Sequence, residues 1–67
     1  MKVEYSYMDA VARAKALGAT ISDGINWTWA NGFPSEKVAW EFISAFSNMD
    51  TRGVYPTDKG TYDVRFR

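Results

Sequence analysis

The sequence predicts an α+β fold: a two-layer sandwich in which an antiparallel sheet of four or five strands carries two helices on one face. Two stretches, near residues 7–17 and 35–49, show the helical spacing of apolar residues, whereas the segments around them alternate apolar and polar side chains as half-buried strands do. Two Gly-containing turns separate adjacent strand segments and indicate hairpins. With 67 residues the chain has room for a single domain, 1–67.

The N-terminal segment predicts a strand followed by a helix. Residues 2–7 alternate in the manner of a half-buried strand. Ser6 and Asp9 resemble a capping box in which Asp replaces Glu, so the helix is expected to begin near Tyr7. Alanine dominates the apolar side of this helix, which allows close approach to a sheet, and Gly18 is placed to end it.

The middle of the chain predicts a hairpin and then the second helix. β-prone runs at 20–22 and 25–30 flank an Asp-Gly pair, which is among the strongest hairpin signals. The segment after residue 30 breaks the strand and starts a helix near residue 35, with either Pro34 in its first turn or Ser35 as its N-cap. The apolar face of this helix extends to Met49. The resulting order, βαββαβ with one added strand, resembles the ferredoxin-like plan.

The two tryptophans of this hairpin have two interpretations. Trp27 and Trp29 share the parity of Ile25, which favours burial of both rings beneath the helices. Alternatively, the rings lie about 6.6 Å apart on one side of a strand and form a platform for stacked bases or another ligand. In an RNA-recognition sheet the aromatic residues lie on the open side. If both tryptophans are buried, the open side of this strand carries Asn26 and Thr28 instead. The sequence therefore favours the core for both tryptophans.

Trp40 departs from the apolar stripe of the second helix. On a helical wheel it projects roughly 160° from Phe42, among polar residues. Because exposed tryptophans are enriched in interface hot spots, contact with a partner is one interpretation. The other is that the ring covers the preceding loop. Glu41 is its charged neighbour, and Ile43 at the margin of the stripe extends the same patch.

The C-terminal segment predicts a second hairpin, with strands near 54–57 and 61–67. Arg65 and Arg67 alternate with the apolar residues of the last strand, and together with Arg52, Lys2 and Lys59 they form a basic group. Arginines there can bind phosphate or acidic protein groups through paired hydrogen bonds. Solvated charges that discourage edge-to-edge aggregation explain them equally well.

The composition argues against catalysis, a metal or a cofactor. The chain has no His and no Cys, and it lacks a Gly-rich phosphate loop and metal-ligand spacing, although a carboxylate pair such as Glu36 with Asp9 or Asp23 stays open. Eight basic and eight acidic residues cancel, which disfavours strong non-specific binding to a polyanion. No apolar stretch is long enough for a signal peptide or a membrane span, so we expect no membrane partner and a cytoplasmic location.

In size, absence of cysteine and α+β order, the whole chain resembles small accessory proteins of bacteriophages and mobile elements, including anti-CRISPR proteins, although it shares no motif with them. The resemblance implies a non-enzymatic inhibitor that docks on a host defence complex in the bacterial cytoplasm and blocks nucleic-acid or nuclease access. The alternative is a nucleic-acid-binding domain that uses the open sheet face and the C-terminal arginines. The chain is expected to be a monomer or a homodimer paired through residues 54–57. The expected partner-binding residues are Trp40, Glu41, Ile43, Arg52, Tyr55, Arg65 and Arg67.

Overall fold

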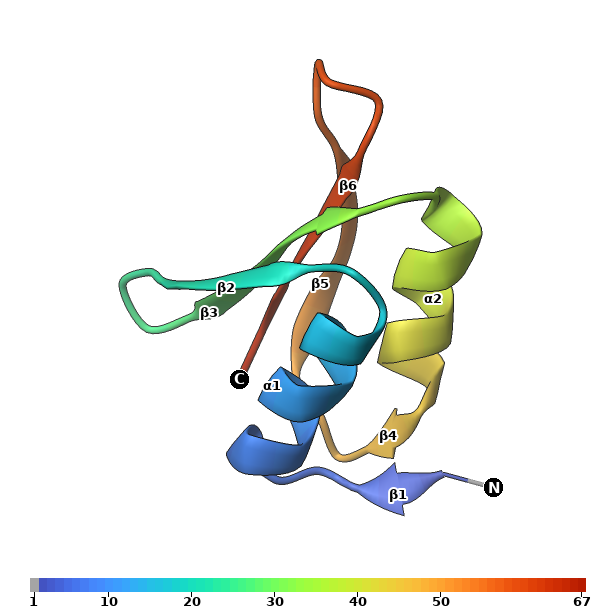
Figure 1. The fold of residues 1–67 in the computed structure, drawn as a ribbon. Coiled ribbons are helices and arrows are strands. Elements are labelled where there is room, and N and C mark those ends of the chain that lie inside the picture. Colours follow the sequence, from blue (N-terminus) through green and yellow to red (C-terminus); the bar gives the residue numbers. More distant parts are fainter. Residues whose placement is uncertain (1) are drawn as a thin grey trace.

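A computed structural model describes residues 2–67 as a four-stranded antiparallel sheet with two helices on one of its faces and a short parallel strand pair beside them (Figure 1). The strands of the main sheet lie in the order β2-β3-β6-β5, and β1 pairs with β4. The predicted α+β class, with two helices and four antiparallel strands, is confirmed. The elements are β1 (Val3–Glu4), α1 (Tyr7–Ala16), β2 (Thr20–Asp23), β3 (Thr28–Phe33), α2 (Glu36–Ser44), β4 (Phe46–Ser47), β5 (Thr51–Pro56) and β6 (Tyr62–Phe66).

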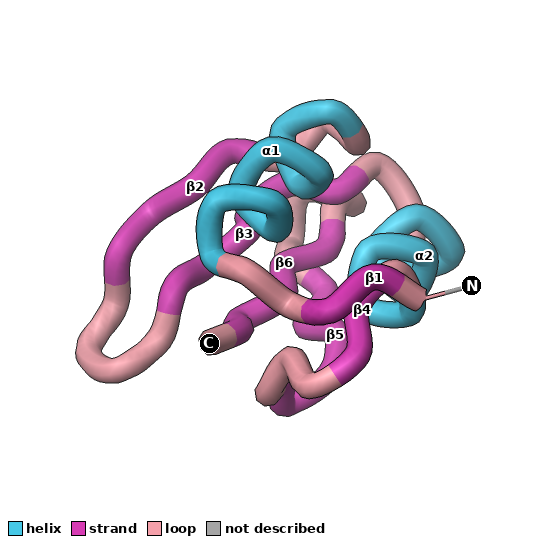
Figure 2. Tube along the Cα trace, turned by 90° about the horizontal axis from the view of Figure 1, so that it is seen from below, coloured by secondary structure: helices cyan, strands magenta, loops and turns pink. Residues whose placement is uncertain are grey.

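The ferredoxin-like order is not confirmed, because the first strand lies outside the main sheet. Ser6 caps α1 and Tyr7 begins it, and the strand before them, β1, has two residues. This strand runs parallel to β4, with Val3 opposite Phe46. The two strands lie side by side in Figures 1 and 2. Because β4 occupies Phe46–Ser47, the second helix ends at Ser44, before Met49, to which its apolar pattern extends.

Both helices begin at the predicted serine caps. The Asp9 N–H donates to Ser6 Oγ at 3.2 Å, and the Val38 N–H donates to Ser35 Oγ at 3.2 Å. Each serine satisfies a backbone donor that has no partner within its helix. Beyond α1, Gly18 has φ +97°, a left-handed conformation that favours glycine.

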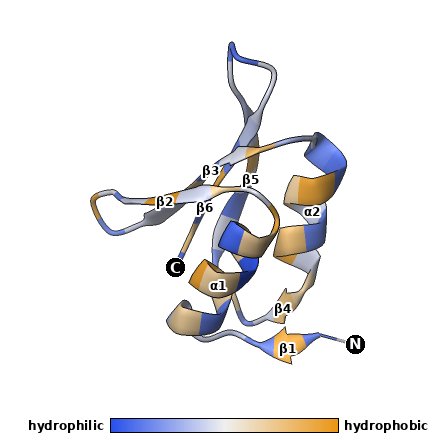
Figure 3. Ribbon diagram, in the orientation of Figure 1, coloured by the Kyte–Doolittle hydropathy of each residue, from blue (hydrophilic) through white to orange (hydrophobic). Residues whose placement is uncertain are grey.

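The core lies between the helices and one face of the sheet and combines small alanines with phenylalanines. Figure 3 shows apolar and polar stretches alternating along the helices, as expected of helices with one buried side. The ring of Phe42 lies 5.3 Å from that of Phe33 and 5.4 Å from that of Phe66, measured between centroids. The fully buried residues are Ala10, Ala14, Ala30, Phe33, Ala39, Phe42, Val64 and Phe66. The face of the sheet that carries Ala30, Phe33, Val64 and Phe66 packs against the helices, and we call it the covered face. We call the opposite face the open face.

Candidate functional site on the open face of the sheet

The registers of β3 and β6 determine which side chains lie on the open face. Ala30 and Val64 are directly opposite each other and fully buried on the covered face. The neighbouring pair, Trp29 and Arg65, therefore points to the other side, because successive residues of a strand alternate between faces. In β5, Tyr55 is paired with Asp63 and shares the side of Trp29.

The prediction that Trp27 and Trp29 belong to the core is wrong. The covered face of β3 takes Ala30 instead, which has no exposed surface and lies in the same cluster as the alanines of both helices. A shift in register between Ala30 and Phe33 brings Phe33 to the covered face as well. With both positions filled, the two indoles lie on the open face.

The β2–β3 connection also differs from the expected two-residue turn. Asp23 pairs with Thr28, so four residues connect the strands, and the Gly24 N–H donates to the Trp27 carbonyl at 2.8 Å. Ile25, predicted to lie in the strand and to share the buried side with both tryptophans, is 90% exposed at the tip. A Cβ on Gly24 would lie 2.9 Å from Nε1 of the Trp29 ring, so glycine leaves room for that indole beside the loop.

Three aromatic rings and three arginines gather on the open face. The centroids of Trp29 and Tyr55 are 5.6 Å apart. The guanidinium carbon of Arg65 lies 5.0 Å from the ring centroid of Trp27, 5.9 Å from that of Trp29 and 5.5 Å from that of Tyr55. Arg67 lies 4.2 Å from the Trp27 ring and Arg52 lies 5.8 Å from it. We call this group the aromatic–arginine surface: Trp27, Trp29, Arg52, Tyr55, Arg65 and Arg67.

The surface carries positive charge although the whole chain is neutral. Arg67 Nε is 3.1 Å from Asp50 Oδ2 in an ion pair whose side chains are both about half exposed, at 50% and 52%. Within residues 2–67, Arg52 and Arg65 form no ion pair. The Nε atom of Arg65 is buried without a hydrogen-bond partner, so ring contacts hold this guanidinium in place. The carboxylate of Asp63 accepts from the Gly32 N–H at 2.9 Å and is committed to the sheet.

A hollow lies at each end of the β3–β6 strand pair, the first on the covered side of the sheet and the second on the open face. At the end formed by the β2–β3 loop, a hollow of about 310 Å³ includes Trp27 and Arg67 in its wall. At the other end, one of about 390 Å³ is bordered by Asn31, Lys59 and Asp63, next to the turn of the β5–β6 hairpin.

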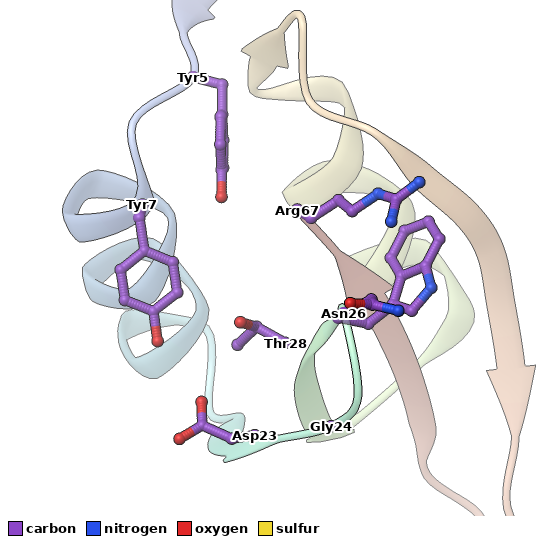
Figure 4. A pocket seen from close by; sticks show the side chains of 8 residues that line it. Tyr5, Tyr7, Asp23, Gly24, Asn26, Thr28 and Arg67 are labelled. Atoms are coloured by element: carbon purple, nitrogen blue, oxygen red, sulfur yellow. The ribbon is translucent and has the colours of Figure 1, made fainter.

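Figure 4 shows the first hollow from close by. Tyr5 and Tyr7 stand on one side, Asn26 and Arg67 on the other, and Thr28 lies between them. Burial raises the pKa of the Tyr5 phenol above its ordinary value, and the neighbouring Tyr7 adds to this effect.

The predicted partner-binding residues fall into two separate groups. Tyr55 and the three arginines come together on the open face, as part of the aromatic–arginine surface. Trp40 and Glu41 are exposed on α2, which covers the other side of the sheet, and Trp40 is 45% exposed. Ile43 is half-buried and packs against the core. A single surface containing all seven residues is therefore not formed.

The prediction missed Trp27 and Trp29 as members of the site. Ala30 has the opposite parity on the same strand, but it is small, and Phe33 shares the parity of the tryptophans and reaches the covered face only through the register shift. The sequence therefore carries no clear signal that could have found them. Within the described part of the chain, no group of three or more His, Cys, Asp or Glu side chains is placed to hold a metal ion. No helix of residues 2–67 has both the length and the apolarity that a membrane crossing requires.

Comparisons of the chain with protein-family models, with curated proteins and with solved structures gave no match.

Proposed function

We propose that this domain binds single-stranded nucleic acid on its aromatic–arginine surface. The observation that carries the proposal is the placement of Trp27, Trp29 and Tyr55 on the face of the sheet opposite the helices, with guanidinium groups between and beside them. Single-stranded nucleic acids bind to such sheets by stacking bases on aromatic rings and placing phosphates near basic side chains.

The chemistry of each residue type suits this ligand. A base stacked on an aromatic ring contributes about 1–3 kcal/mol whatever its identity, because every base has a π face. Arg52 and Arg67 lie at the margin of the surface and are exposed, so they can reach phosphate oxygens. Arg65 lies among the rings and orients them before any ligand arrives, which lowers the entropy lost on binding.

The balanced charge of the chain limits the electrostatic part of this binding. Three arginines on the surface neutralise few phosphates, and one of them is already paired with Asp50. For two or three neutralised phosphates the logarithm of the affinity should fall with the logarithm of salt concentration with a slope of about −1.5 to −2. Binding should therefore depend more on stacking than on charge and persist at moderate salt.

Fluorescence anisotropy with labelled single-stranded DNA and RNA oligonucleotides tests the proposal. We expect Trp27→Ala to weaken binding about tenfold or more, since it removes a stacking ring and the contact of Arg67 with it. Trp40→Ala is the matched control, because this exposed tryptophan lies on α2, and it should leave the affinity unchanged. Absence of binding by the unmodified domain at low salt overturns the proposal.

A second candidate function is docking on a protein, and the exposure of Trp40 favours it. A large ring that is 45% exposed next to Glu41, on the outer side of α2, has the character of an interface anchor. In this case the domain acts as the resemblance to anti-CRISPR proteins implies, as a small inhibitor that blocks a host complex. Trp40→Ala should then abolish capture of a bacterial protein complex in a pull-down while the melting temperature stays nearly unchanged. Equal capture by both forms excludes this role of Trp40.

A further inference from the structure

The first hollow, beside the β2–β3 loop, contains polar side chains that have no partner within the protein. Asp23, Asn26, Thr28 and the hydroxyl of Tyr7 make no side-chain hydrogen bond within residues 2–67. Figure 4 shows the Asp23 carboxylate and the Tyr7 hydroxyl at one end of the hollow and the Asn26 amide at the other. Donors and acceptors are thus available around a space of about 310 Å³.

Comparable side chains on the strands of the sheet and at β4 are already paired. The Asn31 amide donates to Ser22 Oγ at 2.7 Å, and the Asn48 amide donates to Glu4 Oε1 at 3.2 Å. The carboxylate of Asp63 accepts from a backbone N–H. Among the strands of the main sheet and the β2–β3 loop, Asp23 and Asn26 are therefore the carboxylate and the amide that stay free for a ligand.

The hollow meets the aromatic–arginine surface at the end of the sheet but opens on the covered side, because Asp23 pairs with Thr28 and Thr28 lies opposite the buried Phe66. Trp27 and Arg67 belong to both, and the guanidinium of Arg67 lies against the Trp27 ring at the boundary. A nucleotide strand that stacks on Trp29 and Tyr55 and passes Trp27 therefore has to turn round the end of the sheet, beside the β2–β3 loop, to place its next base in the hollow. Arg67 can meet a phosphate there, whereas the carboxylate of Asp23 repels one, so the part of the nucleotide that fits inside is the base.

We propose that this hollow accepts one unstacked guanine base of the bound strand, an inference that rests on the proposed function. The ionised carboxylate of Asp23 only accepts hydrogen bonds. Guanine is the one common base whose Watson–Crick edge presents two adjacent donors, N1–H and the N2 amino group. Adenine and cytosine place an acceptor nitrogen beside their amino group, and uracil and thymine place carbonyls on both sides of N3–H. Asp23 therefore selects guanine by a paired hydrogen bond.

The other side chains of the hollow complete the recognition. The Asn26 amide and the Thr28 hydroxyl can donate to guanine O6 and N7, and the tyrosine rings at the side offer an apolar wall. Asn26 has φ +63° in the four-residue loop, so the backbone of this hairpin holds the amide at the tip. The stacking surface binds any base, and the hollow supplies the sequence preference.

The test compares two oligonucleotides of equal length, an all-thymidine strand and the same strand with one guanine. We expect the strand with guanine to bind at least about fivefold more tightly, the scale of a good paired hydrogen bond to a base. A strand with inosine, which lacks the N2 amino group, should lose most of this gain. Asp23→Asn should bring the ratio of the two affinities to about one, because an amide presents a donor to one of the guanine donors. Asp58→Asn, in the turn of the other hairpin, is the matched control and should keep the ratio.

The outcomes separate the inference from the function on which it rests. Binding of all strands without preference for guanine, or preference for another base, overturns the guanine site and leaves the stacking surface standing. Retention of the preference in Asp23→Asn, with circular dichroism showing a folded domain, also overturns it. Failure to bind any oligonucleotide at low salt overturns the proposed function itself.

Discussion

The two faces of the sheet use aromatic residues in opposite ways. On the covered face, Phe33 and Phe66 pack against Phe42 of α2, and buried alanines belong to the same cluster. On the open face, tryptophan and tyrosine rings alternate with arginines. Phenylalanine has no polar atom and fills a dry core at no hydrogen-bonding cost, whereas indole and phenol groups carry a polar atom that needs water or a ligand.

This difference shows that the kind of aromatic residue, more than the number, distinguishes the buried side of the sheet from the open face in this small domain. A 67-residue chain buries a modest fraction of its surface and has no disulfide, so the covered face carries most of the burden of folding. The open face is then free to vary in composition. The predictions below test this division, in order of decreasing expected effect.

The largest effect is expected from truncating the side chain by which α2 packs against the covered face. Phe42→Ala removes a fully buried ring that contacts three other phenylalanines and should lower the free energy of unfolding by about 3–5 kcal/mol. Urea denaturation followed by circular dichroism measures the loss. Tyr55→Ala, on the open face, is the comparison and should cost less than half as much. Equal losses for the two variants would show that both faces contribute alike to stability.

A medium effect is expected from enlarging the small residue of the covered face. Ala30→Leu places a larger side chain where Ala30 already has no exposed surface, and overpacking of this kind costs about 1–3 kcal/mol. The matched control is Ala12→Leu, the same substitution at an exposed position of α1. Thermal unfolding should show a lower melting temperature for Ala30→Leu alone. If Ala30→Leu also melts at the wild-type temperature, the prediction is wrong, because the core around Ala30 then has room for a leucine side chain.

The smallest effect is expected at the edge of the covered face and only at high pH. Tyr5 packs edge-on against Phe46 and Phe66, and burial raises its pKa. Because the folded-state pKa lies above the unfolded value near 10, the stabilisation from the neutral phenol is complete below about pH 10. It is lost as the pH rises through the folded-state pKa. Tyr5→Phe should therefore keep its stability at neutral pH and decline less in an alkaline denaturation series; the same decline in both proteins would contradict this role.

The sequence was sufficient to predict the helices and the last strand, because the signals there are local. Ser6 and Ser35 are the N-caps, and each works through a residue three positions later. In β6 the apolar residues all fall on one parity, so Val64 and Phe66 have a single possible face and Arg65 takes the other. The basic part of the candidate site followed from this pattern.

The orientation of β3 could not be predicted in the same way. Trp27 and Trp29 offer far more apolar surface than Ala30, and a pattern judged by hydrophobicity alone turns the larger residues inward. The outcome depends instead on how closely the alanine-rich helices approach and on the register shift that brings Phe33 inward, both of which are tertiary features. The pairing of Val3 with Phe46 was equally hidden, since two-residue strands carry no alternation that a sequence can display.

The short parallel pair of β1 and β4 has a consequence for the order in which the domain loses its structure. Its hydrogen bonds, from the Val3 N–H to the Ala45 carbonyl at 2.9 Å and from the Tyr5 N–H to the Ser47 carbonyl at 3.0 Å, close a loop that spans both helices and the first hairpin. Long loops cost more entropy to close, and only two strand residues on each side repay it here. These amides are therefore expected to exchange with solvent hydrogen before those of the two hairpins. The aromatic–arginine surface is built by the hairpins alone, so it can persist while the N-terminal strand detaches and reattaches.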